Sequence, residues 1–327
     1  MKKILLVALA AAAMVSCSQN EEIENAAQKA EINFETVVRV GTKAAIVTTE
    51  SLNTFTVNGY KTVQAMDGSV QLATGFMDNQ TLTKGTDWKL SSPFYWPSSG
   101  YVQFFATSPK QDLSLPVGYP TFDYTVKSIA NQEDLIAAFV NDQSKTTDAI
   151  TLPFKHLLTQ VNFSIKGDTK DFTYKVTELV IKGMKDKATF VFSATDSLGS
   201  WTNLSVSTSD IKYTYSNSDP GVTVTPVSED LSEVTNFDTT DALFMLLPQN
   251  LTNVVSLDIT YSAAHKDKLS EPTFNGTKNV KLTGTWGMSK NVRYTLVLKS
   301  DASPINLTPS VGGWTNGTGT IEPEPAS

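Results

Sequence analysis

The chain has 327 residues, of which 18% are charged and 40% hydrophobic, and its formal net charge is -7. This balance is typical of a folded, mildly acidic protein and provides no basic stripe for binding DNA or RNA. Once an amino-terminal signal is removed, roughly 310 residues remain, which is more than one core usually organises, so we expect two domains.

The amino terminus has the features of a lipoprotein signal peptide. Lys2 and Lys3 form the charged region, residues 4–15 form the apolar region, and Ser16 is the small residue before cleavage. Cys17, the only cysteine, stands where a lipid would be attached. We therefore expect lipidation at Cys17. The alternative is a signal peptide without lipid, in which Cys17 is incidental.

A polar tether and a strand follow the signal. Residues 18–29 are polar and acidic, so they form no core. From Glu31 onward the apolar residues alternate with a period of two, which is typical of a strand with one buried face. The first strand is expected at residues 31–40, and its inward residues are Ile32, Phe34, Thr36, Val38 and Val40.

The rest of the chain reads as all-β. Alternation is clearest at Val255-Leu257-Ile259-Tyr261, and it recurs at Val161-Phe163-Ile165, Phe190-Phe192 and Val292-Tyr294-Leu296-Leu298. Helical signals are few. The best lies at residues 131–141, where Asn131 would cap a short helix.

A composition dip at residues 166–171 is the best candidate for a domain boundary. We expect the following segments: 1–17 as signal peptide, 18–43 as tether and first strand, 44–167 as the first β-domain, 168–300 as the second and 301–327 as a tail. The tail ends in Glu322-Pro323-Glu324-Pro325, which is typical of a disordered end.

Few residues indicate chemistry. His156 lies beside a strand and is expected to be a hydrogen-bonded structural histidine, whereas His265 lies in a polar loop. No nucleophile elbow, Walker loop, HExxH helix or calcium loop occurs, so we predict no catalytic, cofactor or metal site and no enzyme. The alternative is an enzyme whose carboxylate pair is brought together by the fold from scattered Asp and Glu residues. The aromatic run at residues 93–97, followed by Tyr101, Phe104 and Phe105, predicts core packing, with a sugar-stacking platform as the alternative.

Several segments, in this order, resemble the fimbrillin (Mfa-like) family, the type V pilins of anaerobic gut and oral bacteria. They are Tyr95-Trp96-Pro97, GYVQFFATSP at 100–109, LPFKHLLTQVNFSI at 152–165, VTELVIKG at 176–183, ALFMLLP at 242–248, NVRYTLVL at 291–298 and VGGW at 311–314. The resemblance covers nearly the whole exported chain.

The resemblance implies two transthyretin-like β-sandwich domains in tandem. It also implies that a trypsin-like protease cuts after a basic residue and releases the first strand. Arg39-Val40 is the first match to this cleavage site and Lys43-Ala44 the second. The released strand would hold Ile32, Phe34, Thr36 and Val38. The alternative is that Arg39 faces solvent on a permanent first strand.

The vacated groove would accept a donor strand from the next subunit by backbone pairing. The tail contains a candidate donor with Ile305, Leu307 and Val311 on one face and Trp314 after them. Pro309 on the same face lacks an N–H, so it would require an edge position or a bulge. The alternative is that this segment pairs within its own second domain.

The resemblance therefore predicts a pilus subunit, most simply of the stalk, that supports adhesion and biofilm formation. Its partners would be copies of itself, related pilus subunits, the outer membrane through the lipid, the processing protease, and host or bacterial surface ligands. The lipidated precursor would lie at the outer membrane and the mature subunit in an extracellular fimbrium. The alternatives are a tip or anchor subunit, and a monomeric lipoprotein that binds glycans.

Overall fold

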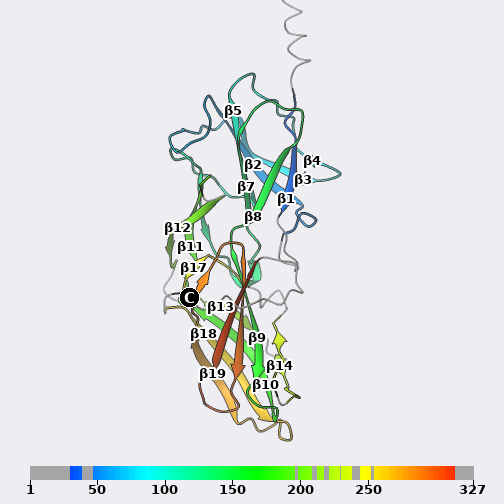
Figure 1. The fold of residues 1–327 in the computed structure, drawn as a ribbon, viewed down its shortest axis with the longest axis vertical. Helices are drawn as coiled ribbons and strands as arrows, with labels where there is room; N and C mark the ends of the chain where they lie inside the picture. The colour runs from blue at the N-terminus through cyan, green and yellow to red at the C-terminus, as the bar shows by residue number, and fades with distance from the viewer. Residues whose placement is uncertain are drawn as a thin grey trace, which may run out of the picture.

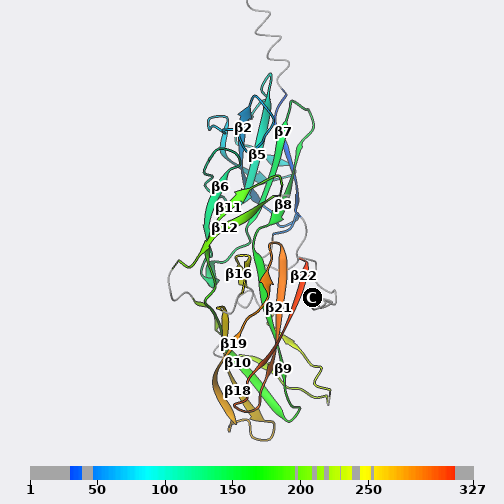
Figure 2. The same ribbon diagram turned by 60° about the vertical axis from the view of Figure 1, so that its left-hand side comes forward.

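In a computed structural model of the protein, the structure describes residues 30–38, 47–195, 198–207, 212–216, 221–228, 230–237, 244–251 and 254–313. The regular structure in these ranges is β-strand, apart from the 3-10 turn η1 (Ile129–Asn131). The predicted all-β fold class is confirmed. Figures 1 and 2 show two β-structures stacked along the long axis of the molecule, which we call the first and second units.

A seven-stranded sheet forms most of the first unit. Its strands are, in spatial order, β1 (Phe34–Val38), β8 (Ile150–His156), β7 (Ile136–Gln143), β5 (Tyr101–Ser108), β2 (Thr54–Thr62), β3 (Met77–Lys84) and β4 (Trp88–Lys89). The sheet curls until its two end strands approach each other, because Trp88 Nε1–H of β4 donates to Thr36 Oγ1 of β1 over 3.0 Å. The curl encloses an apolar core that includes Phe55, Phe104 and Phe154.

The outer face of this sheet is covered by a three-stranded sheet in the order β12 (Gly199–Ser205), β11 (Lys187–Phe192) and β6 (Thr121–Thr125). Successive residues of a strand point to opposite faces. Phe104 and Phe105 of β5 are accordingly buried on opposite sides: Phe104 lies inside the curl, and Phe105 contacts Phe192 of β11 with ring centroids 5.2 Å apart.

The second unit is built from two further sheets. The first contains β13 (Lys212–Ser216), β10 (Phe172–Lys182), β18 (Ser256–His265) and β19 (Phe274–Lys281) in that order, and β14 (Val222–Val224) also pairs with β10. The second contains β15 (Thr235–Asn236), β9 (Thr159–Gly167), β21 (Lys290–Leu298) and β22 (Asn306–Gly313), and β16 (Phe244–Leu246) also pairs with β9. A short ladder joins β17 (Gln249–Asn250) to β20 (Thr285–Trp286). The four clearest strands predicted from alternation are confirmed as β18, β9, β11 and β21.

The two units are joined without a linker. Only Leu157 and Leu158 separate β8 from β9, and both are fully buried. Trp201 Nε1–H donates to the Leu157 carbonyl over 2.8 Å, and Ser289 N–H donates to the Leu158 carbonyl over 3.1 Å. The larger apolar core runs from Phe105 and Phe122 in the first unit to Tyr261 and Tyr294 in the second.

Sheet pairing runs across the boundary expected between residues 167 and 168. β9 precedes that boundary but pairs in parallel with β21 of the second unit, from Asn291↔Gln160 to Leu298↔Gly167. β11 follows it but pairs with β6 of the first unit. The polar dip at 166–171 instead connects β9 to β10 inside the second unit, and a turn between strands has the same composition as a turn between domains.

The helix predicted at residues 131–141 is wrong. This segment contains the end of η1 and most of β7, which pairs with both β5 and β8. Leu135, Ile136, Ala137 and Ala138 are all fully buried. A strand that is buried on both faces has a continuous apolar run, and periodicity alone does not distinguish that run from a buried helix.

Candidate functional site

The first strand contributes directly to the core inside the curled sheet. Ile32, Phe34 and Val38 are 0%, 4% and 1% exposed, and Thr36 between them is half-buried. The Phe34 ring meets the Phe104 ring edge to face at a centroid distance of 5.2 Å. Because one face of β1 supplies core side chains, the strand is an integral part of the first unit.

In the described part of the chain, one edge of β1 is paired as a ladder. It runs parallel to β8, in register from Phe34↔Ile150 to Val38↔Phe154, and Ile150 N–H donates to the Asn33 carbonyl over 2.7 Å. In a parallel ladder alternate residues bond the neighbouring strand. The backbone groups of Asn33, Glu35 and Val37 therefore face β8, and those of Phe34 and Thr36 face the other way.

The other edge of β1 borders a groove of about 650 Å³ that is lined by Leu82, Trp88 and Leu90, among others. The backbone of the first strand is hydrogen-bonded at both ends of this groove. Ile32 N–H donates to the Phe94 carbonyl over 2.8 Å, and Val38 N–H donates to Thr49 Oγ1 over 2.9 Å. Between these points no backbone hydrogen bond joins β1 to β4 in the described part of the chain. Among the described residues, the hydrogen bond from Trp88 to Thr36 is the one side-chain hydrogen bond between β1 and β4.

The predicted cleavage residues Arg39, Val40, Lys43 and Ala44 lie outside the described residues, between two held positions. Val38 is held on one side by Thr49. On the other side Val47 N–H donates to Asp134 Oδ2 over 2.9 Å. The polypeptide between residues 38 and 47 is thus the covalent link between β1 and the rest of the first unit.

Asp134 and His156 form a buried pair behind Val47. His156 Nδ1 lies 2.7 Å from Asp134 Oδ2, and both residues are 2% exposed. The pair joins the end of β8 to the segment before β7, and Asp134 also accepts the Val47 N–H. His156 is therefore a hydrogen-bonded structural histidine, as the sequence predicted.

The candidate donor segment pairs inside its own second unit. β22 is antiparallel to β21, with Leu307 opposite Leu296 and Val311 opposite Val292. This arrangement is the alternative that the sequence left open. Ile305 is 9% exposed, Leu307 and Val311 are half-buried, and Trp314 lies outside the described residues.

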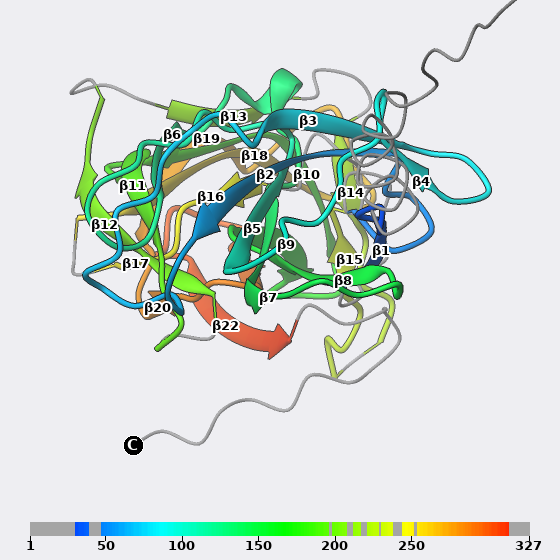
Figure 3. The same cartoon turned by 90° about the horizontal axis from the view of Figure 1, so that it is seen from above.

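β22 is an edge strand with a largely exposed surface. It ends the order β15-β9-β21-β22, and Figure 3 shows it along the outer margin of the molecule. Asn306, Thr308 and Pro309 are exposed. Pro309 is tolerated because the outer side of an edge strand requires no N–H donor.

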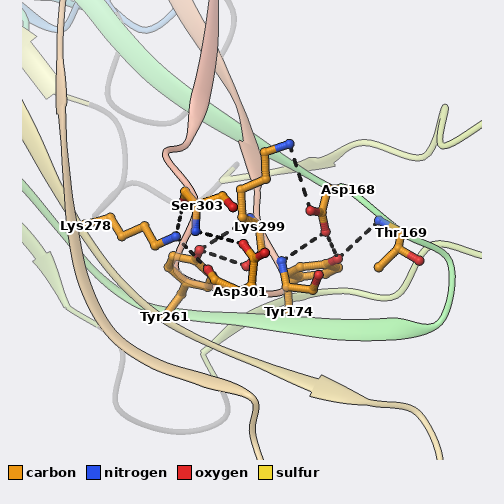
Figure 4. A network of polar contacts seen from close by, with 9 residues as sticks. Asp168, Thr169, Tyr174, Tyr261, Lys278, Lys299, Asp301 and Ser303 are labelled. Atoms are coloured by element: carbon orange, nitrogen blue, oxygen red, sulfur yellow. Dashed lines mark hydrogen bonds and ion pairs between the residues drawn. The ribbon is translucent and has the colours of Figure 1, made fainter.

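Residues 299–305, which we call the connector, link β21 to β22 and are bound by side chains of β18, of β19 and of the turn between β9 and β10 (Figure 4). Tyr261 of β18 donates its hydroxyl to the Lys299 carbonyl over 2.9 Å and accepts the Lys299 N–H over 3.3 Å. Asp168 Oδ1 accepts the Ser300 N–H over 3.0 Å. Burial raises the pKa of Tyr261 to about 12, so this hydroxyl stays protonated near neutral pH.

Lys278 of β19 binds the second half of the connector. Its Nζ donates to the Asp301 carbonyl over 2.7 Å and also to the Ser303 carbonyl, and it lies 4.5 Å from the centre of the Phe274 ring. Partial burial lowers the pKa of Lys278, and the nearby Asp301 and Asp168 oppose that effect. Hydrogen bonds from Ser303 lower the pKa of the Asp301 carboxyl.

The aromatic run at 93–97 is used mainly for packing. Trp96, Phe104 and Phe105 are buried, and of the three aromatic side chains at 93–97 only Tyr95 is exposed. Among the described residues no group of three or more His, Cys, Asp or Glu is arranged to hold a metal ion. No helix in the same ranges has the length and hydropathy needed to cross a membrane.

Sequence reasoning missed both supports of these strands. These supports are hydrogen bonds between residues that are far apart in the chain. One runs from Trp88 to Thr36, and the others join the connector to Tyr261, Asp168 and Lys278. Trp88 follows Thr86-Asp87 in a polar stretch, and this isolated large aromatic residue was the one available signal. Cys17 lies outside the described residues.

A family model described as fimbrillin-like matches residues 39–314 of the chain. A fimbrial protein from Bacteroides vulgatus is 21% identical with a TM-score of 0.65, and the match covers 88% of this chain and 100% of that one. A candidate cell adhesion protein from Bacteroides uniformis is 17% identical with a TM-score of 0.54, again over 88% and 100% of the two chains. No curated protein matches the chain. At these identities the two structures establish a shared fold.

Proposed function

Because the chain belongs to the fimbrillin-like family, we propose that it is a structural subunit of a type V pilus that polymerises head to tail by donor-strand exchange. The observation that supports this proposal best is β1. This edge strand buries three apolar side chains in the core, yet its backbone is paired along one edge and its covalent link to the rest of the unit contains Arg39.

Maturation would proceed by export, lipidation and cleavage. Cys17 would hold the precursor at the outer membrane, where β1 fills its own groove and keeps the precursor monomeric. A trypsin-like protease would cut between Arg39 and Val40, with Lys43-Ala44 as the second choice. The cut would separate the lipid and β1 from the rest of the subunit, which then enters an extracellular fimbrium.

Loss of β1 exposes both an apolar groove and the unpaired edge of β8, and such an edge requires a new partner. The donor would be β22 of another copy or of a related pilus subunit, with Ile305, Leu307, Val311 and Trp314 as the inserting residues. Because donor and acceptor are different surfaces, the contact is heterologous and propagates into a filament.

We favour a stalk subunit, because a cleavable first strand and a spare last strand occur in the same chain. An anchor would keep β1 and its lipid, and a tip would need no donor strand. In each role the protein is structural, with no catalytic step, and it contributes to adhesion and biofilm formation. Burial of Trp96, Phe104 and Phe105 removes the main support for a monomeric glycan-binding lipoprotein.

The first test is Arg39→Ala, with Arg39→Lys as its matched control because trypsin-like proteases accept lysine. We expect Arg39→Ala to retain its amino-terminal segment and to remain monomeric, whereas Arg39→Lys is cut and forms polymers. The measurements are amino-terminal sequencing of surface protein and a polymer ladder on mildly denaturing gels. Normal polymers from Arg39→Ala would move the cut to Lys43 or refute cleavage-driven assembly.

The second test removes residues 304–327. We expect a folded, cleaved subunit that accepts a donor but fails to extend the filament, so that it ends chains when it is mixed with the intact protein. Filament length by electron microscopy measures this effect. Unimpaired extension would show that the donor lies elsewhere in the chain.

A further inference from the structure

The connector and β22 are attached to the second unit in different ways. Every backbone N–H and carbonyl of Lys299 and Ser300 is hydrogen-bonded to a side chain. The Tyr261 hydroxyl bonds both the N–H and the carbonyl of Lys299. Asp168 accepts the Ser300 N–H, and Thr273 Oγ1 donates to the Ser300 carbonyl over 2.6 Å. Lys278 adds two bonds to the next turn. These partners come from several segments of the second unit, so the connector is fixed from several sides.

β22 depends on one ladder. In the described part of the chain its one side-chain hydrogen bond is from Ser310 Oγ to the Arg293 carbonyl, at 3.3 Å. Its other contacts are the edge pairing with β21 and the half-buried side chains of Leu307 and Val311. Local opening is easiest where few apolar contacts and exposed hydrogen bonds hold a segment.

We propose that residues 299–303 of the connector form a fixed pivot, from which Ile305 and β22 separate while these residues keep their bonds to Tyr261, Asp168 and Lys278. Pro304 follows the last bound residue, Ser303, and its ring restricts φ to about −65°. The strand therefore leaves the second unit from one point and over a narrow range of directions. Lys278 and Tyr261 are positioning residues for β22 and do not themselves contact the partner.

The role of the pivot in assembly rests on the proposed function, because it assumes that β22 is the donor. A strand whose base is fixed loses less freedom when it is captured by a second copy, and it samples a smaller volume around the acceptor. The pivot therefore raises the rate of filament growth without contributing any contact at the interface.

Hydrogen exchange of the full-length protein, read residue by residue, tests the pivot itself. We expect the amides of Lys299, Ser300 and Ser303 to exchange at least about tenfold more slowly than those of β22. Exchange of connector and β22 at one common rate would mean that they open as a single element, and would overturn the proposal.

Two pairs of variants sharpen this test. Tyr261→Phe and Tyr294→Phe each delete one buried hydroxyl in the second unit, but Tyr294 binds Trp286 Nε1 and does not contact the connector. Lys278→Met and Lys281→Met each remove one lysine of β19, and Lys281 is exposed. We expect only Tyr261→Phe and Lys278→Met to speed connector exchange, by about tenfold, as for the loss of a hydrogen bond.

Growth of filaments from cleaved protein tests the role in assembly. Tyr261→Phe and Lys278→Met should slow growth by about three- to tenfold, the two control variants should not, and Lys278→Arg should recover most of the rate because it keeps a donor at that position. Faster connector exchange with unchanged growth would refute the role in assembly. If removal of residues 304–327 leaves growth intact, the donor assignment fails, while the exchange measurements still decide whether the pivot exists.

Discussion

β1 and β22 are both edge strands, one near each end of the described chain, but they are attached to the protein in opposite ways. β1 buries Ile32, Phe34 and Val38, and burial of each such side chain contributes roughly 1.5–3 kcal/mol. β22 leaves Leu307 and Val311 half-exposed. Removal of β1 therefore costs several kcal/mol and leaves a groove, whereas detachment of β22 costs much less. An edge position alone does not make a strand easy to release.

The largest change in stability is expected for Phe34→Ala. Phe34 packs against Phe104 in the core, so its truncation should reduce the free energy of unfolding by about 3–5 kcal/mol. Val37→Ala on the same strand is the control, because Val37 is 49% exposed and should cost under about 0.5 kcal/mol. Urea unfolding measures both variants. Equal effects would mean that β1 is not packed as described.

Leu307→Ala tests the other strand. Leu307 is half-buried, so we expect a loss of about 1 kcal/mol, confined to the opening of β22 and not to global unfolding. The measurement is hydrogen exchange of β22 amides, with the exposed Thr308→Ala as control. A loss as large as that of Phe34→Ala would abolish the contrast between the two strands.

The third test concerns the hydrogen bond across the groove. Trp88→Phe keeps the ring against Phe55 but deletes the donor to Thr36, and should cost about 0.5–1.5 kcal/mol. Thr36→Val removes the acceptor with similar volume. A double-mutant cycle by urea unfolding should then give a coupling of the same size. A coupling of zero would mean that β1 is held on this side only at its ends.

Local pattern predicted the strands well and their assignment to units poorly. Val255 to Tyr261 alternates strictly because one face of β18 meets the core and the other meets solvent. β7 shows no alternation of apolar and polar residues, because both of its faces are buried. The return of β11 to pair with β6 depends on contacts between residues far apart in the chain, such as Phe190 and Phe122, which are 68 positions apart, and no spacing in the sequence encodes that choice.

The residues of the candidate site also fall into a group that the sequence predicted and a group that it did not. The inward residues of β1 followed from alternation, and Ile32, Phe34 and Val38 do lie in the core. The contacts of the connector could not be predicted from the sequence, because Lys278 binds backbone carbonyl oxygens of Asp301 and Ser303. Every residue has a backbone carbonyl, so a side chain that binds one leaves no recognisable pair of residue types in the sequence.

The passage from β8 to β9 through Leu157 and Leu158 has a mechanical consequence. A force applied along the long axis of the molecule is transmitted between the units by Leu157 and Leu158. Both residues are fully buried, and their carbonyls accept hydrogen bonds from Trp201 and Ser289. No slack segment separates the units at this point. Tension is therefore carried by the apolar core that runs through both units, and a subunit placed end to end with others would stretch little before one of its sheets shears.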